Sequence, residues 1–309
     1  MRRVLRHSLL LVLFWLVGLS LGYPSVNRYQ PGPPALGDAT YYAEMVETGI
    51  TQMRDVGHWF TALLVVNAGF CAAAALVLYI MGTGVLGGTR HGLAAAFLFL
   101  VNFNTANLYL SGLVDSAEIC LLSLVLMALW RGRWGLLPLL GLFGGAAKET
   151  FVGFAGLLAG GWWLAGLAHH GLRPRLIMAV AAMGIGALAV VIALWSGLSG
   201  HLVLPGGIAE SYLAERTLIQ RLGDLAAYLS SRAFWYTFAW LLPLAALGAR
   251  SLPREFLWAA AVSLAGALFM AAWANAGDNI GRPLFAAAGP IMVIAAAAGL
   301  ARLTESDDA

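Results

Sequence analysis

The segment AAKETF at residues 146–151 carries the strongest chemical signal in the chain. Lys148 is the only lysine in the sequence, and it lies beside Glu149 between two apolar stretches. Charged groups at membrane depth are costly, and those that persist are usually paired or functional. Neighbouring helical residues do not face one another, so each charge could have a separate partner. We expect Lys148 to bind a substrate anion and Glu149 to act in acid-base chemistry, or the two to neutralise buried charges and fix a helix break.

A second acidic pair, Asp115 and Glu118, lies in SGLVDSAEICLL. Their three-residue spacing places both carboxylates on one helix face, where they could share a proton, bind a cation or orient a hydroxyl acceptor. Acids in a first helical turn also stabilise the helix dipole, which is the structural alternative. We include both residues among the catalytic candidates.

Further candidates lie near the ends of apolar stretches. Asp38 could act as a general base, or cap a helix, and Tyr41 lies three residues after it as a substrate-binding candidate. Arg282, in ANAGDNIGRP, could hold a phosphate in bidentate fashion, with Asp278 close by in the sequence. An interfacial anchor is the alternative for Arg282. Asn107, at the end of another apolar stretch, completes the substrate-binding candidates.

The elements that must position these residues are membrane helices. Of the 309 residues, 61% are hydrophobic and 11% charged, whereas a soluble domain has about 25% charged residues. Mean hydropathy is +0.80. Cys71 and Cys120 lie inside apolar runs, so neither a disulfide framework nor a CxxC metal site is expected. The arginines lie in short loops and indicate topology, not nucleic-acid binding.

Apolar runs near the length of a membrane helix recur along the whole chain, and they predict about ten membrane helices. The expected spans are residues 8–23, 59–81, 92–110, 115–130, 136–147, 150–168, 177–196, 234–249, 257–274 and 284–301. Residues 136–168 are too many for one crossing, so we expect two short helices that meet at Lys148 and Glu149. The first span resembles a signal peptide, but no cleavage site follows it, and we interpret it as retained.

The basic residues support this break. If residues 136–168 cross the membrane twice, 11 of the 18 Lys and Arg residues fall on one side of the membrane. The positive-inside rule assigns this side, together with both chain termini, to the cytoplasm. These residues are Arg2, Arg3, Arg6, Arg90, Arg131, Arg133, Arg173, Arg175, Arg250, Arg254 and Arg302. Most acids fall on the opposite side, which predicts an extracytoplasmic site in a plasma or inner membrane protein.

Two long loops on that opposite side, residues 24–58 and 197–233, each contain a helical pattern of apolar residues. We expect both patterns to form helices on the membrane surface. The sequence thus predicts an all-α, polytopic transmembrane bundle that forms a single transmembrane domain over residues 1–309.

The order of these features, with the LVDSAE, GAAKETF and RPLFAAAGP segments, resembles the GT-C superfamily of membrane glycosyltransferases that use polyprenyl-phosphate sugars. The resemblance implies a GT-C-like bundle, a lipid-linked sugar donor, and transfer of the sugar to an acceptor at the extracytoplasmic face. It implies Asp38 as the base, and as the ligand of any Mg or Mn ion, with Lys148 or Arg282 on the lipid phosphate. The first loop has only Asp38 where the family commonly has an acidic pair, and no large soluble domain follows.

Two other functions remain open from the sequence. A transporter or lipid-handling protein would use the membrane-embedded charges as a polar path. A non-catalytic scaffold would use them only to satisfy one another. The sequence has no Walker, HExxH, GxSxG or CxxC motif, which disfavours nucleotide-driven pumping and the familiar soluble hydrolase sites.

Overall fold

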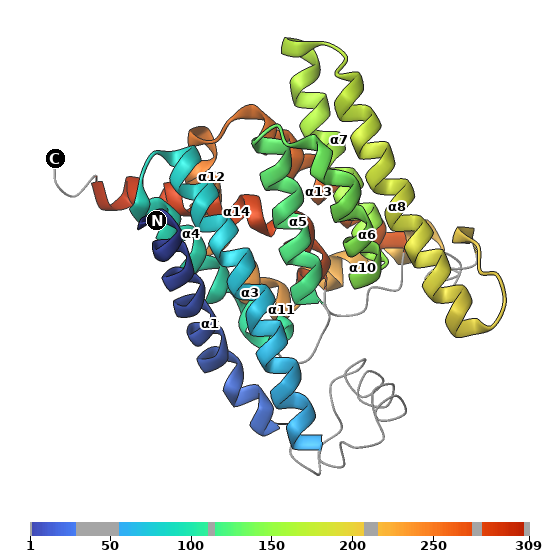
Figure 1. Cartoon of the computed structure of the whole chain (residues 1–309), viewed down its shortest axis with the longest axis horizontal. Helices are drawn as coiled ribbons and strands as arrows, with labels where there is room; N and C mark the ends of the chain where they lie inside the picture. The colour runs from blue at the N-terminus through green and yellow to red at the C-terminus, as the bar shows by residue number, and fades with distance from the viewer. Residues whose placement is uncertain (1, 29–55, 111–114, 207–215, 274–279, 306–309) are drawn as a thin grey trace.

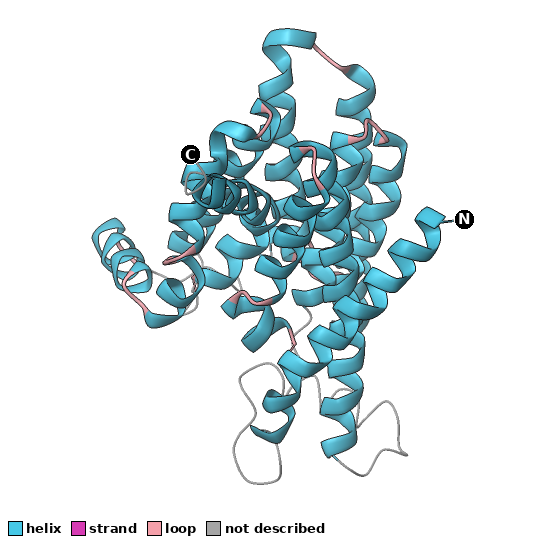
Figure 2. Cartoon of the chain, turned by 90° about the vertical axis from the view of Figure 1, so that its left-hand side faces the viewer, coloured by secondary structure: helices cyan, strands magenta, loops and turns pink. Residues whose placement is uncertain are grey.

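The computed structural model describes residues 2–28, 56–110, 115–206, 216–273 and 280–305, and the regular elements in these ranges are all helical (Figures 1 and 2). The main helices are α1 (Arg2–Arg28), α3 (Val56–Leu86), α4 (Thr89–Leu100), α5 (Asp115–Trp130), α6 (Leu137–Ala147), α7 (Thr150–His170), α8 (Pro174–Ser199), α10 (Leu218–Leu229), α11 (Arg232–Phe238), α12 (Leu241–Gly248), α13 (Arg254–Trp273) and α14 (Gly281–Glu305).

Six of the described helices are long and apolar enough to cross a membrane, so the chain is a multi-pass helical membrane protein. These spans are Arg3–Pro24, Ala62–Leu86, Thr150–Leu167, Pro174–Ser199, Arg254–Trp273 and Gly281–Thr304. The other expected spans form shorter helices, among them the apolar helix Trp134–Ala147. The expected number of ten crossings is therefore not confirmed.

The segment expected to cross once over residues 92–110 is divided. α4 ends at Leu100, and a five-residue π-helical turn follows at Thr105–Tyr109. Between them the side chain of Asn102 accepts a hydrogen bond from the backbone N–H of Asn104 at 3.0 Å. Asparagine side chains compete in this way with regular helical bonding. Isolated π turns often occur at functional sites, and this one lies beside the site described below.

The segment expected over residues 234–249 is likewise divided, into α11 and α12. Pro243 lies near the start of α12. Proline has no backbone N–H and its ring clashes with the carbonyl four residues earlier, so it ends the preceding helix. The result is two short helices in place of one continuous span.

A helix is present in residues 197–233 as α10, and its place on the membrane surface stays a prediction. Thr217 caps it, with Gln220 completing a capping box. Arg221 donates hydrogen bonds to the carbonyls of Ala272 and Trp273, which ties α10 to the end of α13. The expected helix in residues 24–58 falls largely outside the described residues.

The most buried helix of the described bundle is α14. In its most apolar membrane-length stretch 89% of the residues are buried, whereas 11% are buried in the corresponding stretch of α1. α14 passes behind α5 in Figure 1 and packs on α12, α13 and α4. A glycine lets α12 approach α14 closely. A Cβ at Gly248 of α12 would lie 1.8 Å from the carbonyl oxygen of Ala295 of α14. Small residues at helix contacts are typical of membrane bundles.

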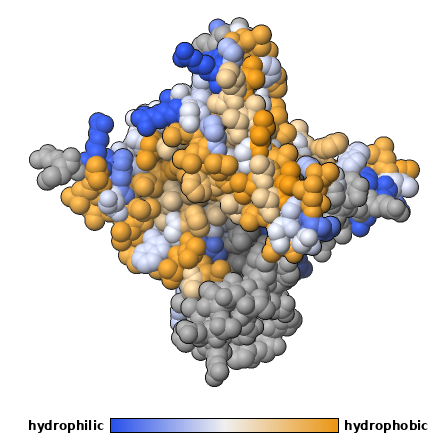
Figure 3. Space-filling model, turned by 45° about the vertical axis from the view of Figure 1, so that its right-hand side comes forward, coloured by the Kyte–Doolittle hydropathy of each residue, from blue (hydrophilic) through white to orange (hydrophobic). Residues whose placement is uncertain are grey.

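Large apolar side chains are exposed on several helices. Leu9, Met178 and Ile185 are each more than half exposed, although they belong to helices long enough to cross a membrane. Figure 3 shows apolar side chains over the middle of the face in view and polar ones toward its margins. A continuous apolar surface of this kind suits a lipid environment. Cys71 and Cys120 are buried free thiols, as expected.

Candidate functional site

The candidate site lies where three segments meet. α5 begins at Asp115, α6 gives way to α7 across Lys148 and Glu149, and α14 begins one residue before Arg282. Lys148 adopts an extended conformation, with φ −166° and ψ 141°, directly after the last turn of α6. Thr150 then begins α7. The expected break at Lys148 and Glu149 is therefore confirmed.

Asp115 is held by two cations from distant parts of the chain. Arg282 donates from Nε to Oδ1 at 2.8 Å and from Nη2 to Oδ2 at 2.6 Å, which is a bidentate pair. Lys148 Nζ donates to Oδ1 of the same carboxylate at 2.5 Å. The Asp115 side chain is 1% exposed, whereas Lys148 and Arg282 keep 15% and 23% exposure. The carboxylate is enclosed, and the two cations are still accessible.

Glu118 lies one turn further along α5 and is fully buried. Thr150 donates to its Oε1 at 2.5 Å, and Lys148 Nζ lies 3.5 Å from its Oε2. Lys148 thus bridges Asp115 and Glu118. The prediction that the two acids share one helix face is confirmed.

The resulting cluster contains two carboxylates and two cations, so its formal charges balance. Isolated buried charges are strongly unfavourable, whereas a hydrogen-bonded set of opposite charges is tolerated. Because both of its oxygens accept from cations, Asp115 is poorly suited to accept a substrate proton. Its role in this arrangement is to hold Lys148 and Arg282 side by side.

Buried amides fix the start of α14. Asn104 Nδ2 lies 3.1 Å from the hydroxyl of Thr237 and 3.1 Å from the carbonyl of Gly281, and donates to both. Asn102 Nδ2 donates to the carbonyl of Thr237 at 3.2 Å. Gly281 directly precedes Arg282. These hydrogen bonds therefore hold the backbone next to Arg282 in place. The irregular segment between α4 and the π turn therefore serves the site.

A hydrogen bond to α3 holds the start of α5. Ser116 donates from its hydroxyl to Oδ1 of Asn67 on α3 at 2.5 Å, and both residues are buried. Tyr109, in the π turn, is also buried and lies close enough to Asp115, Glu118 and Arg282 to experience their charges. Polar groups thus surround the cluster on several sides.

Of the candidates from the sequence, the structure brings together Asp115, Glu118, Lys148 and Arg282, with Glu149 at the adjoining helix break. The amide of Asn107 donates to the carbonyl of Phe103 within its own turn. Asp38, Tyr41 and Asp278 lie outside the described residues.

Several residues that hydrogen-bond in or next to the charged cluster were not predicted from the sequence. Thr150 was visible beside Lys148 and Glu149, and its position at a helix start could have indicated a hydrogen-bonding role. Asn67 and Thr237 gave no such signal, because each lies in an apolar stretch far from its partner in sequence.

The part of the chain that the structure describes has no group of three or more His, Cys, Asp or Glu side chains able to hold a metal ion. Asp115 and Glu118 bond to Lys148, Arg282 and Thr150 instead, so these two carboxylates do not fit a divalent-cation site. Asp38, the expected ligand of Mg or Mn, is outside the described residues.

No family model matches the chain, and no curated protein and no solved structure is significantly similar to it.

Proposed function

We propose that this protein is a GT-C-type membrane transferase, which moves a sugar from a polyprenyl-phosphate carrier to an acceptor at the extracytoplasmic face. The observation that carries the proposal is the convergence of Lys148 and Arg282 on Asp115. Two partly exposed cations lie side by side next to a buried carboxylate that orients them. This arrangement suits the phosphate group of a lipid.

The chemistry of the two cations supports phosphate binding. A guanidinium matches the geometry of phosphate oxygens, and an ammonium adds a compact charge with several donors. In a low-dielectric setting such groups stabilise negative charge far more than they do in water. The leaving phosphate of a sugar donor gains negative charge as its bond to the sugar breaks, so Lys148 and Arg282 would favour that step.

In the proposed reaction the hydroxyl oxygen of the acceptor attacks the anomeric carbon of the sugar. The bond between that carbon and the phosphate oxygen breaks, and its electrons remain on the lipid phosphate. The hydroxyl proton passes to a carboxylate. Asp38 is the base that the GT-C resemblance implies, and Glu149, which follows Lys148 in the sequence, is a second candidate carboxylate. Asp115 is then a positioning residue.

The positions of the arginines support a particular orientation in the membrane. α5, α7 and α14 each begin at the cluster, and arginines lie at or just after their opposite ends: Arg131, Arg173 and Arg302. The positive-inside rule therefore supports a cytoplasmic position for those ends and for both termini, and an extracytoplasmic position for the cluster.

Transport is less well supported, because the polar side chains do not continue along α5. Beyond Glu118 its buried residues are apolar apart from Cys120 and Ser123, whose hydroxyl donates to the carbonyl of Ile119 in its own helix. A substrate path would need further polar groups toward the other end.

The decisive experiment is sugar transfer in proteoliposomes supplied with a polyprenyl-phosphate sugar and an acceptor. Arg282→Gln, Lys148→Gln and Asp38→Asn should each abolish most turnover, while the matched exposed variant Arg216→Gln should keep it. Flux of substrate without a covalent product would establish transport instead. Full turnover in Arg282→Gln would remove the phosphate-binding role.

A further inference from the structure

Glu118 is the member of the charged cluster whose charge is least well compensated. Its side chain is fully buried, and Thr150 donates to its Oε1. Lys148 Nζ lies 3.5 Å from its Oε2, which is longer than an ordinary hydrogen bond of about 2.7–3.2 Å. No donor in the described part of the chain forms a hydrogen bond to Oε2. By contrast, each oxygen of Asp115 accepts a hydrogen bond from Arg282.

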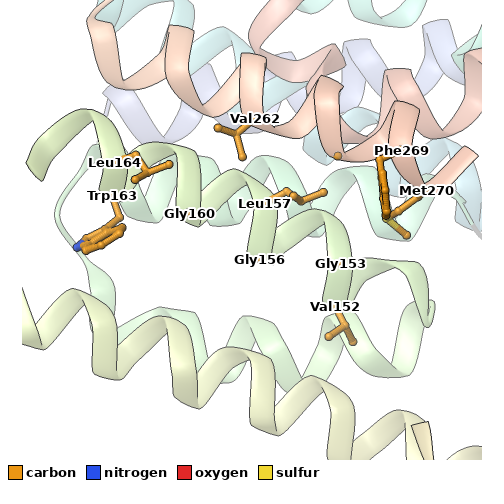
Figure 4. A pocket seen from close by; sticks show the side chains of 11 residues that line it. Val152, Gly153, Gly156, Leu157, Gly160, Trp163, Leu164, Val262, Phe269 and Met270 are labelled. Atoms are coloured by element: carbon orange, nitrogen blue, oxygen red, sulfur yellow. The ribbon is translucent and has the colours of Figure 1, made fainter. Parts of the chain in front are cut away.

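The elements packed around Glu118 carry few titratable groups. α6 has none, and α7 has none from Phe151 to Ala168. The described side chains that line the hollow between α7 and α13 carry no charge (Figure 4). The π turn contributes Tyr109, whose buried hydroxyl has no hydrogen-bond partner among the described residues. The titratable residues at the cluster and beside it are Cys71, Tyr109, Asp115, Cys120, Lys148, Glu149 and Arg282. Because Arg282 is bidentate on Asp115, Lys148 is the cation that compensates Glu118.

A bound phosphate would disturb this compensation. The two carboxylates and two cations of the cluster already balance, so a phosphate adds uncompensated negative charge. Its oxygens would also engage the ammonium of Lys148, which is 15% exposed and lies closest to Oε2 of Glu118. A buried carboxylate that loses its partner is strongly unfavourable, and such groups become neutral by taking up a proton.

We propose that Glu118 takes up a proton when a phosphate binds to Lys148 and Arg282, so that the buried carboxyl becomes neutral as the anion arrives. This inference rests on the proposed function for the phosphate and adds a role for Glu118 at the same site. The proton comes from solvent and forms an O–H bond at Oε2, while Lys148 stays charged and is shared between Asp115 and the phosphate. Glu118 is a positioning residue in this role, because it acts through Lys148.

The need for this proton differs between the two forms of a lipid phosphate. A sugar-linked phosphate is a diester with a single negative charge, whereas the phosphate released by sugar transfer is a monoester with a charge of about −1.5 to −2 near neutral pH. A neutral Glu118 therefore stabilises the released phosphate more than the sugar-linked one. In the proposed reaction this favours departure of the phosphate from the sugar.

The test measures proton uptake when butyl phosphate binds to the full-length protein in detergent micelles. Calorimetry in buffers of different ionisation enthalpy gives the number of protons taken up for each phosphate bound. Between about pH 7.5 and 8.5 butyl phosphate is a dianion, because the second pKa of a phosphate monoester is about 6. We expect wild type to take up about one proton and to take up less with the diester dibutyl phosphate.

Glu118→Gln should bind butyl phosphate without proton uptake, because glutamine is neutral in both states. Its affinity should stay constant over this pH range, whereas the affinity of wild type should fall by up to about tenfold for each pH unit. Asp224→Asn removes a carboxylate that is 38% exposed and is the matched control, which should keep the wild-type uptake.

Infrared difference spectroscopy identifies the group that receives the proton. Phosphate binding should produce the C=O stretching band of a protonated carboxyl in wild type and no such band in Glu118→Gln. Thr150→Val removes the donor to Oε1, which favours the neutral carboxyl, so the uptake should move to higher pH by about one unit. Thr150→Ser should restore the wild-type profile, and this pair of variants keeps the test decisive if Glu118→Gln does not fold.

Phosphate binding without proton uptake, or with full uptake in Glu118→Gln, would overturn the role of Glu118 and leave the proposed phosphate site in place. A carboxyl band that is already present before phosphate is added, and does not change on binding, would have the same consequence. Failure of wild type to bind butyl phosphate, or binding that Arg282→Gln leaves unchanged, would overturn the proposed function and this inference together.

Discussion

The bidentate pair between Asp115 and Arg282 should show strong energetic coupling. Asp115→Asn leaves Arg282 and Lys148 with Glu118 as the remaining carboxylate of the cluster, and Arg282→Met leaves the cluster with an excess negative charge. Removing one partner of a buried pair costs about 3–5 kcal/mol. The double variant removes both charges and leaves Lys148 with Glu118. Its loss in free energy of unfolding should therefore be smaller than the sum of the losses in the two single variants. We expect a coupling energy of about 2–3 kcal/mol.

The assay measures reversible unfolding of the wild type, the two single variants and the double variant in mixed micelles. Dodecyl sulfate is the denaturant, and circular dichroism follows the loss of helix. The exposed pair of Arg216 and Asp224, whose side chains are 35% and 38% exposed, is the matched control. Its double-mutant cycle should be close to additive, because solvent screens exposed charges. Additive costs at Asp115 and Arg282 would refute the buried pair.

Three further perturbations probe packing, hydrogen bonding and capping. Gly248→Ala places a methyl group against the Ala295 carbonyl and should lower the free energy of unfolding by about 1–3 kcal/mol, and an unchanged value would contradict the close approach of α12 and α14. Thr150→Val removes the donor to buried Glu118 and should cost about 1–3 kcal/mol in the same assay, whereas Thr150→Ser should restore most of it. Thr217→Ala should weaken α10 by about 1 kcal/mol, seen as faster amide exchange confined to that helix, and unchanged exchange would argue against the capping box.

Features with a local cause could be predicted from the sequence. The break at Lys148 and Glu149 follows from two charges between apolar stretches, and the structure confirms it. The shared face of Asp115 and Glu118 follows from helical periodicity. The helical pattern of apolar residues in the loop 197–233 likewise predicted a helix there, and the structure has α10.

Features that depend on distant parts of the chain could not be predicted. Asp115 and Arg282 are 167 residues apart, and only the packing of α5 against α14 makes them a pair. The expected ten crossings are not confirmed, because apolar composition does not reveal where the backbone departs from a helix. Asn102 and Pro243 introduce such departures inside stretches that are otherwise apolar enough to continue.

The most direct test of the central claim is the position of the phosphorus atom in an experimental structure of the protein with a bound polyprenyl phosphate. The account predicts phosphate oxygens within hydrogen-bond distance, about 2.7–3.2 Å, of both Lys148 Nζ and the Arg282 guanidinium. A phosphate bound at the arginine-rich ends of α5, α7 and α14, with none at Lys148 and Arg282, would contradict it.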